Sequence, residues 1–367
     1  MKQRLREMDF IRAAAALCII AIHVTAGYVY ASRTAYYLNQ LVRFAVPVFI
    51  LISGLLLYTS DTGYKGVSGY FAFLWRRLKK VFIPYLVWSV IYIIYSVKDD
   101  LGPVWSDKGA FLLGFAKKLL YGSAHAHLYF VVIMIQLYLL YPFLSRLMKL
   151  RPRLVLALSF LLTLFYQTGV YLYLMGLIEF PAPILPNYIF FPTWIFFFVF
   201  GMHFAANLEA WKNKLQGRLL PVCGAWAASL VLLLIDSRLT GTFSSSMKPS
   251  IMLYCLTSFL LMYSFFLPLR NKPHPVLKAL EWLSVQSYLI YLCHLLVMAG
   301  ITSVFWRLGI ASLLQGLPGM LVLYAGVLAG SAVFAYAAAL TPAASALGAV
   351  AIKRKKPASS DNAASIS

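Results

Sequence analysis

The chain has 367 residues, of which 62% are hydrophobic and only 12% charged, and its mean hydropathy is +0.79. Soluble domains are about 45–50% apolar and about 25% charged, so neither a soluble globule nor a disordered chain fits this composition. The net charge of +21 would suggest nucleic acid in a soluble protein, but in a membrane protein it is typical of cytoplasmic loops, so we expect no nucleic-acid partner.

Long apolar runs predict an all-α, polytopic integral membrane protein with about ten transmembrane helices of roughly 20 residues each. The first run follows Lys2, Arg4 and Arg6 as in a signal peptide. It is too long for one, contains Arg12 and lacks a clear cleavage site, so we interpret it as a retained span. The predicted spans are 8–30, 39–59, 79–97, 128–145, 154–175, 185–206, 218–236, 248–268, 284–305 and 318–341.

The positive charges indicate the topology. Most of the 32 Lys and Arg residues lie in alternate loops, and the opposite loops hold fewer, among them Arg33, Arg43 and Arg238. This asymmetry predicts that both termini lie in the cytoplasm. We expect a multi-pass protein of a bacterial plasma membrane. We expect one transmembrane domain, residues 1–345, and a basic, disordered cytoplasmic tail, residues 346–367.

Ionisable residues inside the first span are the first functional candidates, because a charge there is costly unless it is paired or hydrated. Asp9 and Arg12 are three residues apart, so they share a helix face and can pair. Arg12 and His23 are eleven residues apart, which places them on nearly one face and about 16 Å apart along the axis. The alternative is a snorkelling arginine and a hydrogen-bonded core histidine.

Further candidates follow along the chain. Small residues at Ser53 and Gly54 allow close helix packing. Arg76, Arg77 and Lys80 stand at the cytoplasmic edge of the third span, where they could bind phosphates or only fix the topology. The fourth and ninth spans bring further polar side chains to the membrane: His127, Gln136, Tyr291 and His294. The four cysteines lie in apolar runs without metal-ligand spacing, so we expect no metal.

Together these segments resemble the acyltransferase-3 family of integral-membrane O-acyltransferases, in the stand-alone form without an SGNH domain. Lys80 replaces an arginine of the family pattern, and Tyr129 replaces a tryptophan. The resemblance extends over about residues 5–340. It rests on Asp9-Phe-Ile-Arg12…His23, Pro47-Val-Phe-Ile-Leu-Ile-Ser53-Gly54, Arg76-Arg77-Leu-Lys79-Lys80, His127-Leu-Tyr129-Phe130, Phe200-Gly201-Met202 and Ser287-Tyr-Leu-Ile-Tyr291-Leu-Cys-His294.

The resemblance implies transfer of an acyl group, commonly acetyl, from cytoplasmic acyl-CoA to a sugar hydroxyl of a cell-surface glycan or its lipid-linked precursor. His23 would be the base or a transient acyl carrier. Asp9 and Arg12 would organise the entrance.

The other candidates would support the two substrates. Arg76, Arg77 and Lys80 would hold the CoA phosphates, His294, Tyr291 and Gln136 would orient His23 or the acceptor, and His127 would serve the acceptor. Acyl-CoA is expected as a co-substrate, without a tightly bound cofactor. The alternative function is a transporter or flippase of a lipid-linked glycan.

Overall fold

The computed structural model describes residues 4–61, 66–98, 107–179, 187–242 and 244–352, and helices are the only regular secondary structure in these segments. Lys2, Lys65 and most of the predicted tail, residues 353–367, lie outside the described residues. The α-helices are α1 (Arg6–Ala26), α2 (Arg33–Leu41), α3 (Ala45–Thr59), α4 (Gly66–Val97), α6 (Lys108–Tyr121), α7 (Tyr129–Leu150), α8 (Pro152–Leu174), α9 (Ile195–Ala206), α10 (Leu208–Leu215), α11 (Leu219–Thr240), α12 (Pro249–Phe266), α13 (Pro275–Arg307), α14 (Gly316–Ala339) and α15 (Ala344–Leu347).

Among the described residues, nine segments are long and apolar enough to cross a membrane: α1, α2 with α3, α4, α7, α8, α11, α12 with its short extension, α13 and α14. The prediction of an all-helical, polytopic membrane protein is therefore confirmed. It differs in detail at 185–206. There the chain makes two 3-10 turns, η1 (Asn187–Ile189) and η2 (Phe191–Thr193), before α9 begins.

Helix α9 has only 12 residues, or about 18 Å of rise, against a hydrocarbon core of about 30 Å. Its three consecutive phenylalanines, Phe196 to Phe198, are at most 4% exposed, so they pack inside the protein. The apolar run was correctly identified. One long helix does not form there, because Pro192 in η2 lacks the backbone N–H that a continuous series of helical hydrogen bonds would need.

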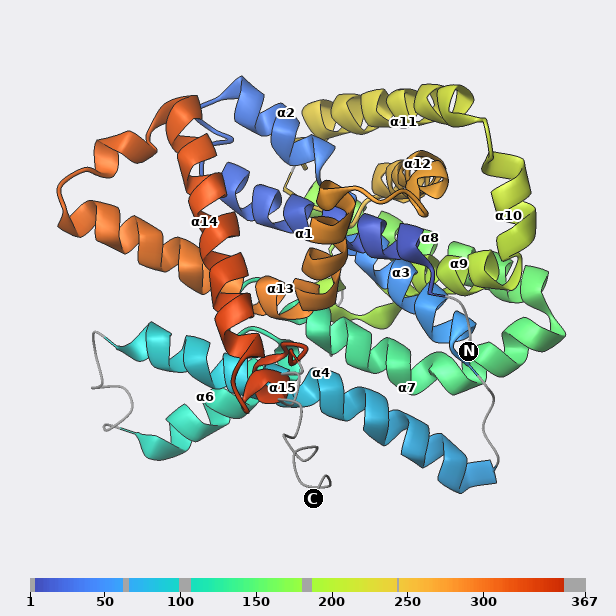
Figure 1. The fold of residues 1–367 in the computed structure, drawn as a ribbon, viewed down its shortest axis with the longest axis horizontal. Coiled ribbons are helices and arrows are strands. Elements are labelled where there is room, and N and C mark those ends of the chain that lie inside the picture. Colours follow the sequence, from blue (N-terminus) through green and yellow to red (C-terminus); the bar gives the residue numbers. More distant parts are fainter. Residues whose placement is uncertain (1–3, 62–65, 99–106, 180–186, 243, 353–367) are drawn as a thin grey trace, which may run out of the picture.

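Helix α1 forms the centre of the bundle and α11 lies at its edge (Figure 1). In the apolar window of α1, 61% of the residues are buried inside the protein, against 11% for α11. Helix α1 packs against α2, α3, α12, α13 and α14. Most side chains on α1 are thus enclosed by protein, whereas α11 faces lipid.

Two glycines let α3 and α9 cross at backbone contact. A Cβ atom on Gly54 would overlap the carbonyl oxygen of Phe198, and one on Gly201 would overlap the carbonyl oxygen of Leu51. Helices in membranes gain much of their packing energy where small residues allow such an approach. The close packing predicted at Ser53 and Gly54 is present, and Gly201 is its partner.

After α14 the chain turns back onto the bundle. The side-chain amide of Gln286 on α13 donates to the carbonyl of Val350 (2.9 Å) and accepts from its N–H (3.0 Å). The indole of Trp88 on α4 donates to the carbonyl of Leu347 at 3.0 Å. The first residues of the segment predicted as a tail are therefore anchored to α13 and α4.

The crossing of α3 and α9 predicts a large effect of one added methyl group. Gly54→Ala should lower the stability of the detergent-solubilised protein by at least the ~1–3 kcal/mol typical of overpacking, because the obstacle is backbone rather than a flexible side chain. Gly224→Ala on α11 is the matched control, since nothing lies within 4 Å of the added Cβ. Thermal unfolding of both variants measures the difference, and equal midpoints would contradict the prediction.

Candidate active site

A network of hydrogen bonds joins the N-terminal end of α1 to α13. The Arg12 guanidinium donates through Nη2 to Asp9 Oδ1 (3.2 Å) and through Nε to Ser284 Oγ (2.8 Å). The Ser284 hydroxyl donates to the same Asp9 oxygen at 3.0 Å, and Arg4 Nε donates to Asp9 Oδ2 at 2.6 Å. The predicted pair of Asp9 and Arg12 exists, and a serine of another helix completes it.

Arg12 also lines a cavity of about 250 Å³, which we call the inner cavity. Lys80 of α4 also lines this cavity, so two cations from different helices border the same space. Its remaining walls are apolar, hydroxyl-bearing or phenolic, and no described lining residue is acidic. The polar lining residues are Arg12, Lys80, Ser53, Tyr138, Ser287, Tyr288 and Tyr291.

The structure separates the predicted basic cluster. Arg77 donates to Ser60 Oγ at 3.1 Å and lies over the Phe73 ring, and Arg76 is exposed. Among these predicted residues, only Lys80 reaches the described walls of the inner cavity. Arg76 and Arg77 lie on the same helix, one turn before it.

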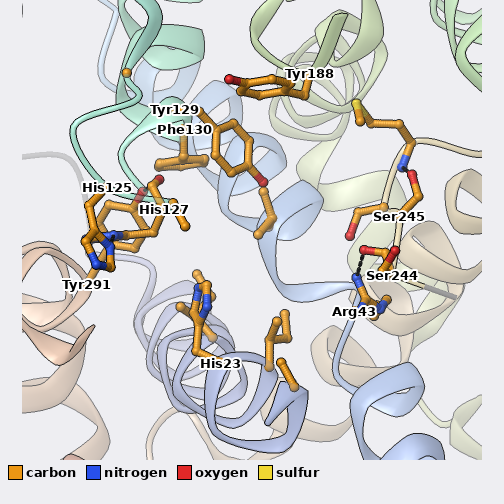
Figure 2. Close-up of a pocket in the computed structure, with 18 of the residues that line it drawn as sticks. His23, Arg43, His125, His127, Tyr129, Phe130, Tyr188, Ser244, Ser245 and Tyr291 are labelled. Carbon is orange, nitrogen blue, oxygen red and sulfur yellow. Dashed lines mark hydrogen bonds between the residues drawn. The ribbon is translucent and has the colours of Figure 1, made fainter. Parts of the chain in front are cut away.

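A second cavity of about 540 Å³, the outer cavity, contains His23. Figure 2 shows His23 and Tyr129 pointing into this space from opposite sides, with His125 and His127 at one edge and Arg43 at another. His23 is half-buried, and its ring makes no hydrogen bond to the described residues. Its nitrogens are therefore available to a substrate.

Three histidines from three parts of the sequence meet here. Ring centroids are 5.1 Å apart between His23 and His294, 5.2 Å between His127 and His294, and 6.4 Å between His23 and His127. The side chains of His127 and His294 are almost completely buried. Packing of α1, α13 and the turn before α7 thus brings together three rings that are more than 100 residues apart in the sequence.

The hydrogen bonds of these rings show which of their nitrogen atoms are already occupied. A carbonyl only accepts, so His294 Nδ1 donates to the Tyr291 carbonyl (2.7 Å), which leaves Nε2 buried and without a partner among the described residues. By the same rule His127 Nε2 donates to the Leu292 carbonyl at 3.2 Å, and its Nδ1 accepts from His125 Nδ1 at 3.3 Å. Burial lowers the pKa of His125, which keeps that ring neutral near pH 7. His127 is therefore fully engaged, whereas His23 is not.

Gln136 lies outside the described walls of both cavities. Its amide donates to the Ile189 carbonyl (2.7 Å) and accepts from the Phe191 N–H (3.1 Å), so it fixes the backbone between η1 and η2. This segment carries Tyr188, whose ring lines the outer cavity and whose carbonyl accepts from the Trp194 indole. Gln136 therefore does not contact the outer cavity directly, but holds the segment that carries Tyr188 to its wall.

The inner and outer cavities adjoin at two aromatic residues, Phe130 and Tyr291, which line both. Their ring centroids are 5.4 Å apart, and the Tyr291 hydroxyl donates to the His127 carbonyl. We call this pair the aromatic partition. It stands between a cationic space and a histidine-lined space.

The depth of each lining residue agrees with the predicted alternation of spans. Along α1 the chain passes from the inner cavity to the outer cavity, whereas along α3 and α7 it passes from outer to inner. On the topology that the charge asymmetry predicts, with the N-terminal end of α1 in the cytoplasm, the inner cavity would be the cytoplasmic one. The pairs, inner residue first, are Arg12 and His23, Ser53 and Val46, and Tyr138 and Tyr129.

Arg43 is a site residue that the sequence reasoning missed. It lies in the break between α2 and α3, where one continuous span, 39–59, was expected, and it lines the outer cavity. The only signal in the sequence was a cation on the side of the membrane that has few. Its partners, Asn39 and the Ser244 carbonyl, include one 201 residues away, which no local pattern reveals.

Named proteins from other bacteria are similar to this chain over most of its length. A Bacillus subtilis (strain 168) protein named as a membrane-bound acyltransferase, YfiQ, is 26% identical over 352 residues, which covers 89% of each chain. A Staphylococcus aureus (strain N315) protein named as a poly-beta-1,6-N-acetyl-D-glucosamine export protein is 24% identical over 280 residues, or 72% of this chain and 71% of the relative. No solved structure gives a significant match.

The profile of the acyltransferase-3 family, described as an acyltransferase domain, matches residues 5–336, nearly the entire described bundle. That range includes the motifs of α1, α3, α4, α7, α9 and α13 and both cavities. The chain belongs to the acyltransferase-3 family and is a multi-pass membrane acyltransferase.

Proposed function

We propose that the protein transfers an acyl group, acetyl by default, from cytoplasmic acyl-CoA to a sugar hydroxyl of a cell-surface glycan or its lipid-linked precursor in a bacterial plasma membrane. The observation that carries the proposal is the pair of adjoining cavities. One is lined by the cations Arg12 and Lys80, the other by His23, and the aromatic partition lies between them.

The inner cavity suits the donor. Acyl-CoA is polyanionic at its nucleotide end, and Lys80 and Arg12 are donors that favour phosphate oxygens. Asp9 and Ser284 hold the Arg12 guanidinium in one orientation. Arg76 and Arg77 lie one turn earlier on α4, where they would attract the nucleotide end.

The outer cavity suits the reaction. His23 as general base would accept the proton of the sugar hydroxyl as its oxygen attacks the thioester carbonyl. The carbon–sulfur bond then breaks, and the CoA thiolate takes the proton back from His23. The Tyr129 hydroxyl, which points into the cavity opposite His23, would donate to the developing oxyanion.

The geometry of α1 links the two substrates. Arg12 and His23 are separated by about 16 Å of helix rise. The pantetheine arm of CoA is long and narrow enough to carry a thioester over such a depth. Opening of the aromatic partition would let the acyl group meet the base. The name of the staphylococcal relative, which refers to a polysaccharide, supports a glycan as the acceptor.

Removal of the His23 imidazole should abolish transfer without unfolding the protein. We expect His23→Ala to lower acyl transfer roughly 10²–10⁴-fold, the usual contribution of a general base, with a normal protein level in the membrane. The measurement is acylation of surface glycans in a deletion strain complemented with each variant. Near-normal acylation by His23→Ala would remove His23 from the mechanism.

The donor site is tested by two neighbouring lysines. Lys80→Ala should raise the KM for acetyl-CoA roughly tenfold, since charge-assisted bonds contribute about 1.5–3 kcal/mol, whereas Lys79→Ala should leave KM unchanged. Both side chains are exposed, but only Lys80 lines the inner cavity. Transfer from radiolabelled acetyl-CoA in inverted membrane vesicles measures both. An equal effect of the two variants would mean that general surface charge matters, not the cavity.

Deletion of the gene distinguishes acyl transfer from export. If the protein is a transferase, mass spectrometry of cell-surface glycans from the deletion strain should show loss of acyl groups from an otherwise intact glycan. A transporter or flippase would instead cause loss of the whole glycan from the surface, without any change in acyl-CoA consumption by inverted vesicles. Unchanged glycans would refute the proposed acceptor class.

A further inference from the structure

We propose that the acceptor carries an anionic group, a phosphate or a carboxylate, beside the hydroxyl that is acylated, and that Arg43 binds this group in the outer cavity. The proposal rests on the proposed function and deepens it, because it assigns a chemical class to the acceptor. It follows from the charge balance of the outer cavity.

Arg43 is a buried cation held by neutral partners. The residue is 7% exposed and lines the outer cavity. One terminal nitrogen donates to the Ser244 carbonyl and the other to Asn39 Oδ1, while Nε is buried and has no partner among the described residues. Asn39 in turn donates to the Thr25 hydroxyl (2.8 Å) and to the Ile22 carbonyl (3.0 Å), so Arg43 is fixed to α1.

No carboxylate neutralises this charge. The described lining of the outer cavity contains neither Asp nor Glu. Asp236 on α11 is occupied elsewhere, because it pairs with Lys248 (3.3 Å) and accepts from Tyr171 and Ser250. A buried charge without a counter-ion is costly, and an anionic ligand would remove that cost.

The groups next to Arg43 suit an anion as well. Ser244, Ser245 and Ser246 line the outer cavity beside it, and Figure 2 shows Ser244 and Ser245 on the same side of the space as Arg43. Their hydroxyls can donate to the oxygen atoms of a phosphate or carboxylate. His23 lines the same cavity, so one acceptor can reach both the cation and the base.

Two acceptor classes share this chemistry. An acidic sugar carries a carboxylate on the ring that is acylated, and a lipid-linked sugar carries a phosphate at its anomeric carbon. The test therefore uses three radiolabelled probes: octyl glucoside, octyl glucuronide and a short-chain polyprenyl phosphoglucose. Binding of each to the full-length protein in nanodiscs is measured by equilibrium dialysis, and acetyl-CoA consumption is measured separately on the same preparation.

We expect at least one anionic probe to bind roughly tenfold or more tightly than octyl glucoside. The glucuronide would identify an acidic sugar, and the phosphate probe a lipid-linked one. Arg43→Gln, which can still donate to the Ser244 carbonyl, should abolish the preference, and Arg43→Lys should retain part of it. Arg33→Gln removes an exposed cation on the neighbouring helix α2 and should change nothing.

Equal binding of all three probes to the wild-type protein overturns the proposal without the need for any variant. A preference for anions that Arg43→Gln retains also overturns it, because another group would then bind the anion. Failure of the proposed function is read from a different measurement. Acetyl-CoA consumption that stays at the level of empty nanodiscs with every probe would contradict acyl transfer, whatever the binding preference.

Discussion

The hydrogen-bonded link among Asp9, Arg12 and Ser284 fixes the arrangement on which the site depends. A charged pair inside an apolar bundle is stable only with good geometry and additional hydrogen bonds, and Ser284 supplies them from α13. The link sets the register of α1 against α13 at the inner end, and at the outer end the same two helices bring His23 and His294 together. A slip of one turn would move His23 by about 5.4 Å and separate the rings.

The aromatic partition separates the inner cavity from the outer cavity, and under the proposed function it would give donor and acceptor separate spaces. Phe130 and Tyr291 belong to different helices and are fixed differently, Tyr291 by its hydrogen bond to the His127 backbone and Phe130 by ring contacts alone. The phenylalanine is thus the more easily displaced member. Under the proposed function, such an arrangement would let a thin acyl chain pass while the wide ends of donor and acceptor stay on their own sides of the partition.

The sequence predicted most of the helices and the two depths of Arg12 and His23, because both depend on local signals. Apolar length identified the spans, and the spacing of Arg12 and His23 on one helix placed them at two depths. The sequence did not reveal the break between α2 and α3 that places Arg43 at the outer cavity, because the apolar run continues through this break. It also grouped Arg76 and Arg77 with Lys80, although only the lysine lines the inner cavity. Which face of α4 points inward is decided by packing against other helices, and charge spacing contains no such information.

The contact of Gly54 with the backbone of α9 has a consequence for biosynthesis. Twelve apolar residues are too few to span the hydrocarbon core alone, so α9 gains little from lipid and much from α3. Because α3 precedes α9 in the chain, it is already inserted when α9 leaves the ribosome and can receive it. A side chain at Gly54 would then hinder the docking of α9 already during membrane integration, and not only in the folded protein.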